Sequence, residues 1–390
     1  MKKICFLIDS IFSFGGVQRV TSVIAKELAK EYVVTIVTFD KEETKDTTLY
    51  QLNESNLNYR FISYPTLGYL HNKICKAYSG YYQKYRPQSK WTSTLYGYSS
   101  FPSPLRKALV KELKEGNYDA IIGVHAPIAG RLATIKNHFR GVKTIGWIHN
   151  SYEALFGERF IYIGTSRKRH YVYQFRKLDH VVLLCQHDAD SYAQYDPLFK
   201  PSVIYNPLTL DPGKISDGTS KRFLAVGRFS RQHKGFDLLI EAFNLFSQHN
   251  SDWILDIVGE GREEKLYEDL ITKYKLEDRV KIHPFTNDVQ SYYSAAQIYV
   301  LSSRWEGFGL VLVEAMAHGL PIVSSDLPTS KEIMGDFGIY FKNGDIEDFA
   351  QRLEEATHID WNQKSKEAIE IAKRFNVETI IKQWKQIIED

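Results

Sequence analysis

The chain has 390 residues, of which 43% are hydrophobic and 25% charged, with a formal net charge of +3 at pH 7. This length predicts two or three domains, and the composition is ordinary for a soluble globular protein. Cys5, Cys75 and Cys185 show neither metal-ligand spacing nor an even framework, which suits a reducing cytosol. Asp9 interrupts the first apolar run, so we expect no signal peptide, and no run approaches the roughly 18 residues of a transmembrane helix.

The two halves of the chain differ in charge. Residues 1–200 contain 28 Lys and Arg against 17 Asp and Glu, whereas residues 201–390 contain 22 against 30. This asymmetry predicts that the first half faces an anionic partner, for which nucleic acid, anionic lipid and a phosphate-bearing substrate all qualify.

The first 40 residues predict a βαβ unit, with strands at 3–8 and 32–39 and a helix at 17–30. Gly15 and Gly16 form the tight turn before the helix. Asp40 ends the second strand 24 residues after Gly16, which raises a dinucleotide-binding alternative. The turn is GGVQRV rather than G-x-G-x-x-G, which disfavours a nicotinamide enzyme.

Residues 67–107 depart from the α/β alternation and are rich in Tyr, Lys and Arg. Such a mixture suits a membrane interface or a stacked ligand. A solvated helical pair whose aromatic residues pack on the domain is an equally good interpretation. Nucleic-acid binding would show the same composition, but no recognition motif accompanies it. A second basic cluster lies at 166–177.

Strands are predicted at 118–124, 144–149 and 181–185. His149 and Asn150 end the second of these, where α/β sheets place ligands, and His125 follows the first. Asp188 and Asp190 form a D-x-D pattern that could hold a metal. We favour their placement in the first turn of a helix, where the helix dipole stabilises acids.

The second half begins after a strand at 203–207 and a polar run at 208–221 that we interpret as a linker. Strands follow at 223–226, 253–258 and 280–285. The first leads to Gly227-Arg228 and Lys234-Gly235, and the second to the glycine turn Gly259-Glu260-Gly261.

Residues 297–326 predict a strand, a loop, a helix from Phe308 and a further strand. The amides of Phe308, Gly309 and Leu310 would lie at the helix N-terminus, where they form an anion site suited to a diphosphate. Glu306 and Glu314 bracket this site. A carboxylate there would repel phosphate, so we expect both to bind sugar or ribose hydroxyls.

Glu306 and Glu314 have seven residues between them, inside EGFGLVLVEAMAHGLPIV. This stretch resembles the E-x7-E signature of retaining glycosyltransferases of family 4. The resemblance covers nearly the whole chain and is strongest over 223–326. It implies an α/β GT-B fold, with two Rossmann-like domains facing across a cleft. The domains would be 1–205, which binds the acceptor, and 206–375, which binds the nucleotide-sugar, while a helix in 376–390 would cross back to the first domain.

The resemblance also implies the site residues. Arg228 and Lys234 would pair with the donor diphosphate without a metal or another cofactor, and Glu306 and His149 would hold the sugar. The expected donor-binding residues are Gly16, Arg228, Lys234, Gly259, His283, Pro284, Phe285, Phe308, Gly309, Leu310 and Glu314, of which Phe285 departs from the glycine common there. Those expected to face the acceptor or membrane are Gly15, Lys84, Arg86, Lys90 and Trp91.

The implied enzyme is a hexosyl- or N-acetylhexosaminyltransferase that uses a nucleotide-sugar, in first place a UDP-sugar. It would work by a metal-independent, same-face mechanism, and domain closure would complete its site. Its acceptor would be a lipid-linked or polymeric glycan of a bacterial polysaccharide or glycolipid pathway, met at the cytoplasmic face of the membrane. The alternatives are a non-catalytic nucleotide-sugar-binding subunit and a GT-B-fold sugar-nucleotide epimerase.

Overall fold

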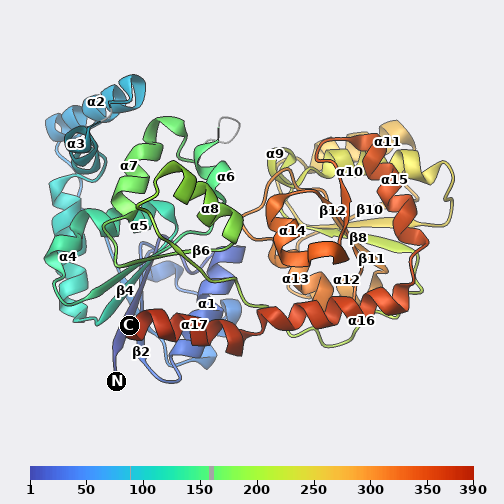
Figure 1. Cartoon of the computed structure of the whole chain (residues 1–390), viewed down its shortest axis with the longest axis horizontal. Helices are drawn as coiled ribbons and strands as arrows, with labels where there is room; N and C mark the ends of the chain where they lie inside the picture. Colours follow the sequence, from blue (N-terminus) through green and yellow to red (C-terminus); the bar gives the residue numbers. More distant parts are fainter. Residues whose placement is uncertain (88, 158–161) are drawn as a thin grey trace. The chain divides into compact units, whose positions relative to one another are not determined.

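The computed structural model describes residues 1–87, 89–157 and 162–390. They divide into two compact units (Figure 1). Unit 1 comprises Met1–Asn206 and Val377–Asp390, and unit 2 comprises Pro207–Asn376. The boundaries predicted from the sequence, 205/206 and 375/376, differ from these by one residue.

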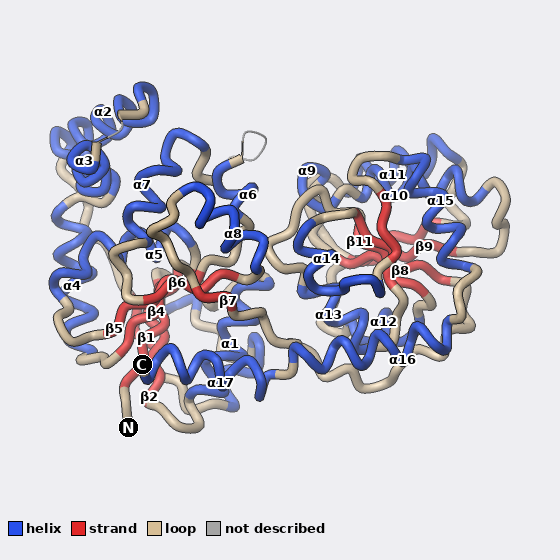
Figure 2. Tube along the Cα trace, viewed as in Figure 1, coloured by secondary structure: helices blue, strands red, loops and turns tan. Residues whose placement is uncertain are grey.

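Unit 1 is built on a seven-stranded parallel sheet. Its five inner strands are mostly buried, because helices cover both faces and each of them is a short, largely apolar run, whereas the two edge strands are partly exposed. Figure 2 shows this sheet with the helices around it. The strand order across the sheet is β3 (Asn58–Phe61), β2 (Val33–Thr38), β1 (Lys3–Ile8), β4 (Ala120–Val124), β5 (Lys143–Trp147), β6 (His180–Leu183) and β7 (Ser202–Val203).

The helices of unit 1 include the one predicted after the first strand and the one predicted at the C-terminal end of the chain. They are α1 (Gly16–Leu28), α2 (Tyr69–Tyr85), α3 (Lys90–Ser100), α4 (Ser103–Gly116), α5 (Ala126–Ile135), α6 (Tyr152–Phe156), α7 (Thr165–Phe175), α8 (Gln186–Tyr195) and α17 (Val377–Glu389).

Helix α17 returns to unit 1, as the sequence analysis expected, and lies against α1. Its apolar face is buried, and the indole of Trp384 meets that of Trp147 at 4.7 Å between ring centroids. At the surface Lys385 donates to Glu31 at 2.6 Å. The C-terminal helix is therefore part of the core of unit 1.

The tyrosine-rich stretch forms a pair of helices, α2 and α3, beside α7. Some of its aromatic residues pack inward, since the Tyr82 and Tyr96 rings stack at 4.4 Å and Tyr96 meets His170 at 4.7 Å. Others point to solvent, including Tyr69, Tyr85 and Trp91. The helical-pair interpretation is thus right for the inner face alone.

Unit 2 is built on a six-stranded parallel sheet. The strand order is β10 (Val280–His283), β9 (Ile254–Val258), β8 (Arg222–Val226), β11 (Ile298–Leu301), β12 (Ile322–Ser325) and β13 (Ile339–Phe341). Its helices are α9 (Arg231–Lys234), α10 (Phe236–Ser247), α11 (Glu264–Tyr274), α12 (Val289–Ala295), α13 (Leu310–Ala317), α14 (Pro328–Met334), α15 (Ile346–Thr357) and α16 (Trp361–Ala372).

The polar run at 208–221 is not a free linker, because it is bonded to unit 2. The Ser216 amide donates to the carbonyl of His318 at 3.0 Å, and the Thr209 hydroxyl donates to Glu314 at 3.2 Å. Its turn-forming residues satisfy their polar groups on the domain surface, which composition alone does not distinguish from a solvated connection.

Candidate active site

Lys234 and Glu306 meet in unit 2. Lys234 ends α9, and Glu306 follows β11 in the loop before α13. The Lys234 ammonium lies 2.6 Å from Oε1 of Glu306, and their side chains are only 12% and 8% exposed. The Ser303 hydroxyl donates to the same oxygen at 2.6 Å. The Gly227-Arg228…Lys234-Gly235 pattern (the GR…KG motif) and the E-x7-E motif therefore share one buried ion pair.

The charge of Lys234 keeps Glu306 ionised. Burial alone would raise the pKa of this carboxyl, but the neighbouring cation outweighs burial and holds the pKa well below its ordinary value. His233 adds to the cluster, with its imidazole stacked on the indole of Trp305 at 3.8 Å and its Nε2 3.7 Å from Glu306. Burial lowers the pKa of His233, which leaves that ring neutral near pH 7.

Further residues, absent from the sequence prediction, tie the two loops together. The Arg304 guanidinium makes a bidentate pair with Asp237, at 2.9 Å for each bond, and Arg231 donates to the same carboxylate at 2.8 Å. The Ser302 hydroxyl donates to the Lys234 carbonyl at 2.8 Å. A bidentate pair between an arginine and a carboxylate fixes the relative orientation of the two groups as well as their distance. Together with the Ser302 hydrogen bond, the Arg304–Asp237 pair therefore holds Lys234 in place beside the loop after β11.

The backbone at Gly235 explains why a glycine follows Lys234. Its φ is 64°, and a Cβ placed there would lie 2.3 Å from the carbonyl oxygen of Ser302. Gly259 meets a similar constraint, since its Cβ would lie 1.9 Å from the carbonyl oxygen of Gly227. Close approach of backbones at these two positions holds the loops at the carboxyl ends of β8, β9 and β11.

Arg228 is exposed and forms no ion pair with any carboxylate in the described part of the chain. It follows β8 and Gly227, in the loop that leads to α9. A guanidinium held near the Lys234 loop without a partner of its own can bind an anion.

The glycine-rich loop ends at Gly309, whose φ of 84° starts α13. No acidic residue lies in the first turn of this helix, so its free amides remain favourable to an anion. The Phe308 ring is buried and packs on Phe375 at 5.8 Å, which fixes the backbone just before Leu310. Glu314 is buried and accepts hydroxyl hydrogen bonds within the chain, from Tyr293 at 3.0 Å and from Thr209.

The expected base-binding residues lie at the end of β10. The imidazole Nε2 of His283 is 2.8 Å from Asp256, so the side chain of His283 is held by the sheet. Its carbonyl accepts from the Gly259 amide at 3.0 Å. Pro284 and Phe285 follow, with the Phe285 ring 43% exposed.

In unit 1 the turn before α1 is held by two residues that the sequence analysis did not assign to it. The Gly15 amide donates to the Tyr50 hydroxyl at 2.8 Å, and that hydroxyl donates to the Ser13 carbonyl at 2.9 Å. Asp40 accepts from the Ile11 amide at 2.9 Å. Asp40, on which the dinucleotide-binding alternative rested, thus anchors the loop that precedes Gly16.

His149 lies just beyond the carboxyl end of β5, next to His125 at 5.4 Å between ring centroids. Burial, with the charge of His125 acting in the same direction, holds the pKa of His149 well below its ordinary value. Its Nε2 is buried and has no hydrogen-bond partner in the described chain. A buried, unpaired nitrogen of this kind suits a contact with a sugar hydroxyl.

The D-x-D acids take part in helix contacts. Asp188 lies in the first turn of α8 and accepts from the Tyr152 amide at 2.8 Å, and Asp190 accepts from Gln186 at 2.7 Å. No three His, Cys, Asp or Glu side chains among the described residues are grouped as metal ligands. None of the described helices is long and apolar enough to span a bilayer.

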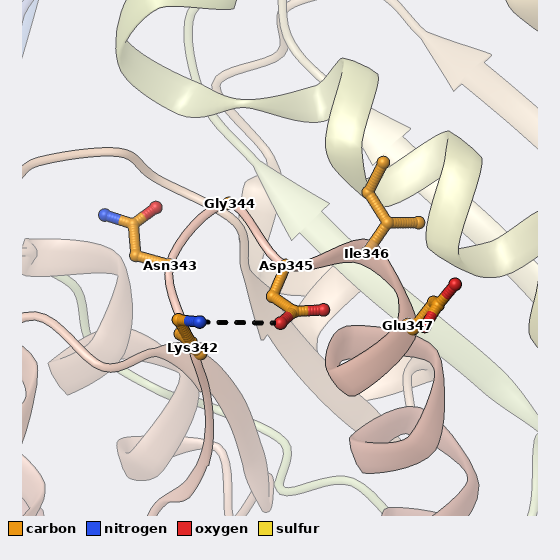
Figure 3. A pocket seen from close by; sticks show the side chains of 6 residues that line it. All are labelled: Lys342, Asn343, Gly344, Asp345, Ile346 and Glu347. Atoms are coloured by element: carbon orange, nitrogen blue, oxygen red, sulfur yellow. Dashed lines mark ion pairs between the residues drawn. The ribbon is translucent and has the colours of Figure 1, made fainter.

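A surface pocket of unit 2 lies in the turn between β13 and α15 (Figure 3). It is lined by residues 342–347, with Lys342 and Asp345 paired at 3.9 Å. None of the predicted donor-binding residues lines it.

Two family models cover most of the chain. One, described as Glycosyltransferase Family 4, matches residues 14–211, and the other, described as Glycosyl transferases group 1, matches residues 210–375. An uncharacterized glycosyltransferase from Haemophilus influenzae is 30% identical over the full length of both chains. The chain belongs to glycosyltransferase family 4.

A second relative of this family 4 glycosyltransferase and one solved structure also match over their full length. AmsD, an amylovoran biosynthesis glycosyltransferase from Erwinia amylovora, is 24% identical with complete coverage of both chains. The crystal structure of Anabaena HepE in complex with UDP and glucose superposes with a TM-score of 0.75 and 22% identity, again over both whole chains. The expected GT-B fold of two α/β domains is thereby confirmed.

Proposed function

We propose that this enzyme transfers a sugar from a UDP-sugar to an acceptor hydroxyl and retains the anomeric configuration of the donor. Support for the donor comes from HepE, whose structure contains UDP and glucose. Support for the chemistry comes from the buried pair of Lys234 and Glu306.

That pair carries the proposal, because it leaves both partners with unused hydrogen-bonding capacity. The Lys234 ammonium has three N–H donors, and one of them donates to Glu306. Lys234 and Ser303 both donate to Oε1 of Glu306, and no described residue donates to Oε2. The remaining lysine donors suit phosphate oxygens, and Oε2 suits a sugar hydroxyl.

The reaction then needs no side chain as general base. The bond from the sugar C1 to the UDP oxygen breaks, a bond from C1 to the acceptor oxygen forms on the same face, and the acceptor proton passes to the departing phosphate. Lys234, Arg228 and the amides at 308–310 stabilise the growing phosphate charge, while Glu306 holds a hydroxyl of the sugar.

We also propose that the transfer is metal-independent. Divalent ions in other phosphate sites neutralise charge on the leaving group. Here two cationic side chains and a helix N-terminus supply that charge from the protein itself.

The acceptor we propose is a lipid-linked or polymeric glycan precursor, met at the cytoplasmic face of the membrane. The excess of Lys and Arg in residues 1–200 supports an anionic surface as the partner of unit 1. The name of AmsD, which refers to amylovoran biosynthesis, supports a bacterial polysaccharide or glycolipid setting.

A donor screen tests the function. Purified enzyme is incubated with UDP-, GDP- and ADP-sugars, and thermal shift and donor hydrolysis are measured for wild type, Glu306→Gln and the exposed control Glu277→Gln. We expect UDP-sugars to give the largest thermal shift and measurable hydrolysis, which Glu306→Gln abolishes and Glu277→Gln preserves.

Other outcomes identify the alternatives. Stabilisation by UDP-sugars without any turnover, even with added glycan acceptors, would indicate a binding subunit. A new sugar nucleotide formed without acceptor would indicate an epimerase. A preference for GDP- or ADP-sugars would overturn the donor assignment.

A further inference from the structure

Helix α2 turns an apolar stripe toward solvent. Leu70, Ile74, Tyr81 and Tyr85 are spaced by four, seven and four residues, which places them on one face of the helix. They are 68%, 61%, 49% and 61% exposed. A surface helix of a globular protein normally shows the opposite arrangement, with its apolar stripe facing the core.

Packing on unit 1 does not use this stripe. The only described residue that α2 buries is Tyr82, on the side that faces Tyr96 of α3. The outer rings pack on each other instead, with Tyr81 and Tyr85 at 5.0 Å between centroids. In Figure 1, α2 lies at the outer edge of unit 1, on the far side of α3 from the sheet.

The charge around the stripe has one sign. Residues 55–111 contain nine Lys and Arg and no Asp or Glu. Lys73 lies over the ring of Tyr69 at 5.9 Å, and Lys84 over the ring of Tyr85 at 5.2 Å. Trp91, which is 69% exposed, lies near the start of α3. The apolar stripe is therefore flanked by cations and further aromatic residues.

We propose that α2 is a bilayer-docking helix that lies in the interface of an anionic membrane. Leu70, Ile74, Tyr81 and Tyr85 enter the head-group and upper acyl region, while Lys73 and Lys84 contact lipid phosphates. Apolar side chains on one face, aromatic rings at the boundary and lysines beside them are the composition of helices that bind membranes in this way.

The stripe favours a bilayer over an anionic glycan as the occupant of this surface. A charged polymer binds through the cations alone and leaves Leu70 and Ile74 in water. A second protein copy would bury the apolar stripe but would bring the same lysines into mutual repulsion. The bilayer satisfies both the apolar and the cationic side chains.

This inference rests on the proposed action at a membrane, and vesicle binding by the full chain tests it. Vesicles of phosphatidylcholine with about 30 mol % phosphatidylglycerol are compared with phosphatidylcholine alone, at low and high salt. The test variant is Leu70→Gln/Ile74→Gln. The matched control is Leu198→Gln/Ile215→Gln, which removes an exposed leucine and an exposed isoleucine outside α2. Thermal melting checks that each variant is folded.

We expect the test variant to lose about 100-fold in partitioning onto anionic vesicles, from the transfer free energy of two partly inserted aliphatic side chains. The control should bind like wild type. Unchanged binding of the test variant, or a wild-type protein that dimerises through this helix and ignores vesicles, would overturn the proposal. Donor hydrolysis should be the same in wild type and test variant. If the catalytic proposal is wrong, hydrolysis will be absent from both proteins, and this result is independent of vesicle binding.

Discussion

Replacement of Lys234 by methionine should impair both stability and turnover, because the lysine compensates a buried charge. Its ammonium lies 2.6 Å from Glu306, and both side chains are nearly buried. Removing one partner of such a pair costs about 3–5 kcal/mol, since the other charge stays in a poorly solvated site. For a unit of this size that corresponds to a fall of about 10 °C in Tm. Turnover should fall by about 10²-fold or more, the scale of one lost electrostatic contact.

The stability loss should depend on pH. In the wild type the lowered pKa of Glu306 stabilises the fold above the ordinary carboxyl pKa of about 4.3, and this contribution disappears as the pH falls through the lowered value. In Lys234→Met, burial instead raises the pKa of Glu306. The native state then disfavours the ionised form, so the penalty grows as the pH rises above about 4.3.

A double-mutant cycle separates the structural role from the catalytic one. Lys234→Met/Glu306→Gln removes both charges, so it should regain most of the lost Tm at pH 7 and none of the lost turnover. Thermal melting at pH 5 and pH 7.5, with donor hydrolysis on the same samples, gives both values. Wild-type turnover in Lys234→Met, or a Tm difference that does not change with pH, would refute the reasoning.

Other changes test other parts of the structure. Glu306→Ala should lower turnover about 10²-fold or more, on the scale of a lost transition-state contact, and wild-type rates would remove it from the site. Activity should persist in excess EDTA, and loss restored by Mg²⁺ or Mn²⁺ would contradict the metal-independent proposal. Lys84, Arg86 and Lys90 together changed to Glu should abolish binding to anionic vesicles, and retained binding would place the docking surface elsewhere. Trp384→Ala should destabilise unit 1 by about 3–5 kcal/mol, measured by denaturant titration, and a change below about 1 kcal/mol would mean that α17 is not part of its core.

Most of the sheet framework is predictable from the sequence because buried parallel strands are short apolar runs. The runs at residues 3–8 and 298–301 coincide with β1 and β11. Short strands with polar residues give little such signal. For this reason β3, with its sequence NYRF at a sheet edge, is missing from the prediction. Strand β13 is also missing, because its three residues IYF are too short a run to show a strand pattern.

The site is predictable where a motif fixes a residue type and not where long-range contacts assign a role. Lys234 and Glu306 stand 72 positions apart, and their direct contact follows only from the packing of α9 against the loop after β11. Asp237 lies two residues after Gly235, and Arg304 lies two residues before Glu306. This closeness to the two motifs is the only sign in the sequence that Asp237 and Arg304 pair. The tyrosines of α2 divide into inner and outer faces only once the neighbouring helix is placed.

The anomeric configuration of the product tests the central claim most directly. Wild-type enzyme is mixed with an α-linked UDP-sugar, with water or a glycan alcohol as acceptor, and the first product is followed by proton NMR before mutarotation. The account predicts an α product and free UDP, formed in the presence of EDTA and absent with Glu306→Gln. A β product, or an α product formed equally well by Glu306→Gln, would contradict it.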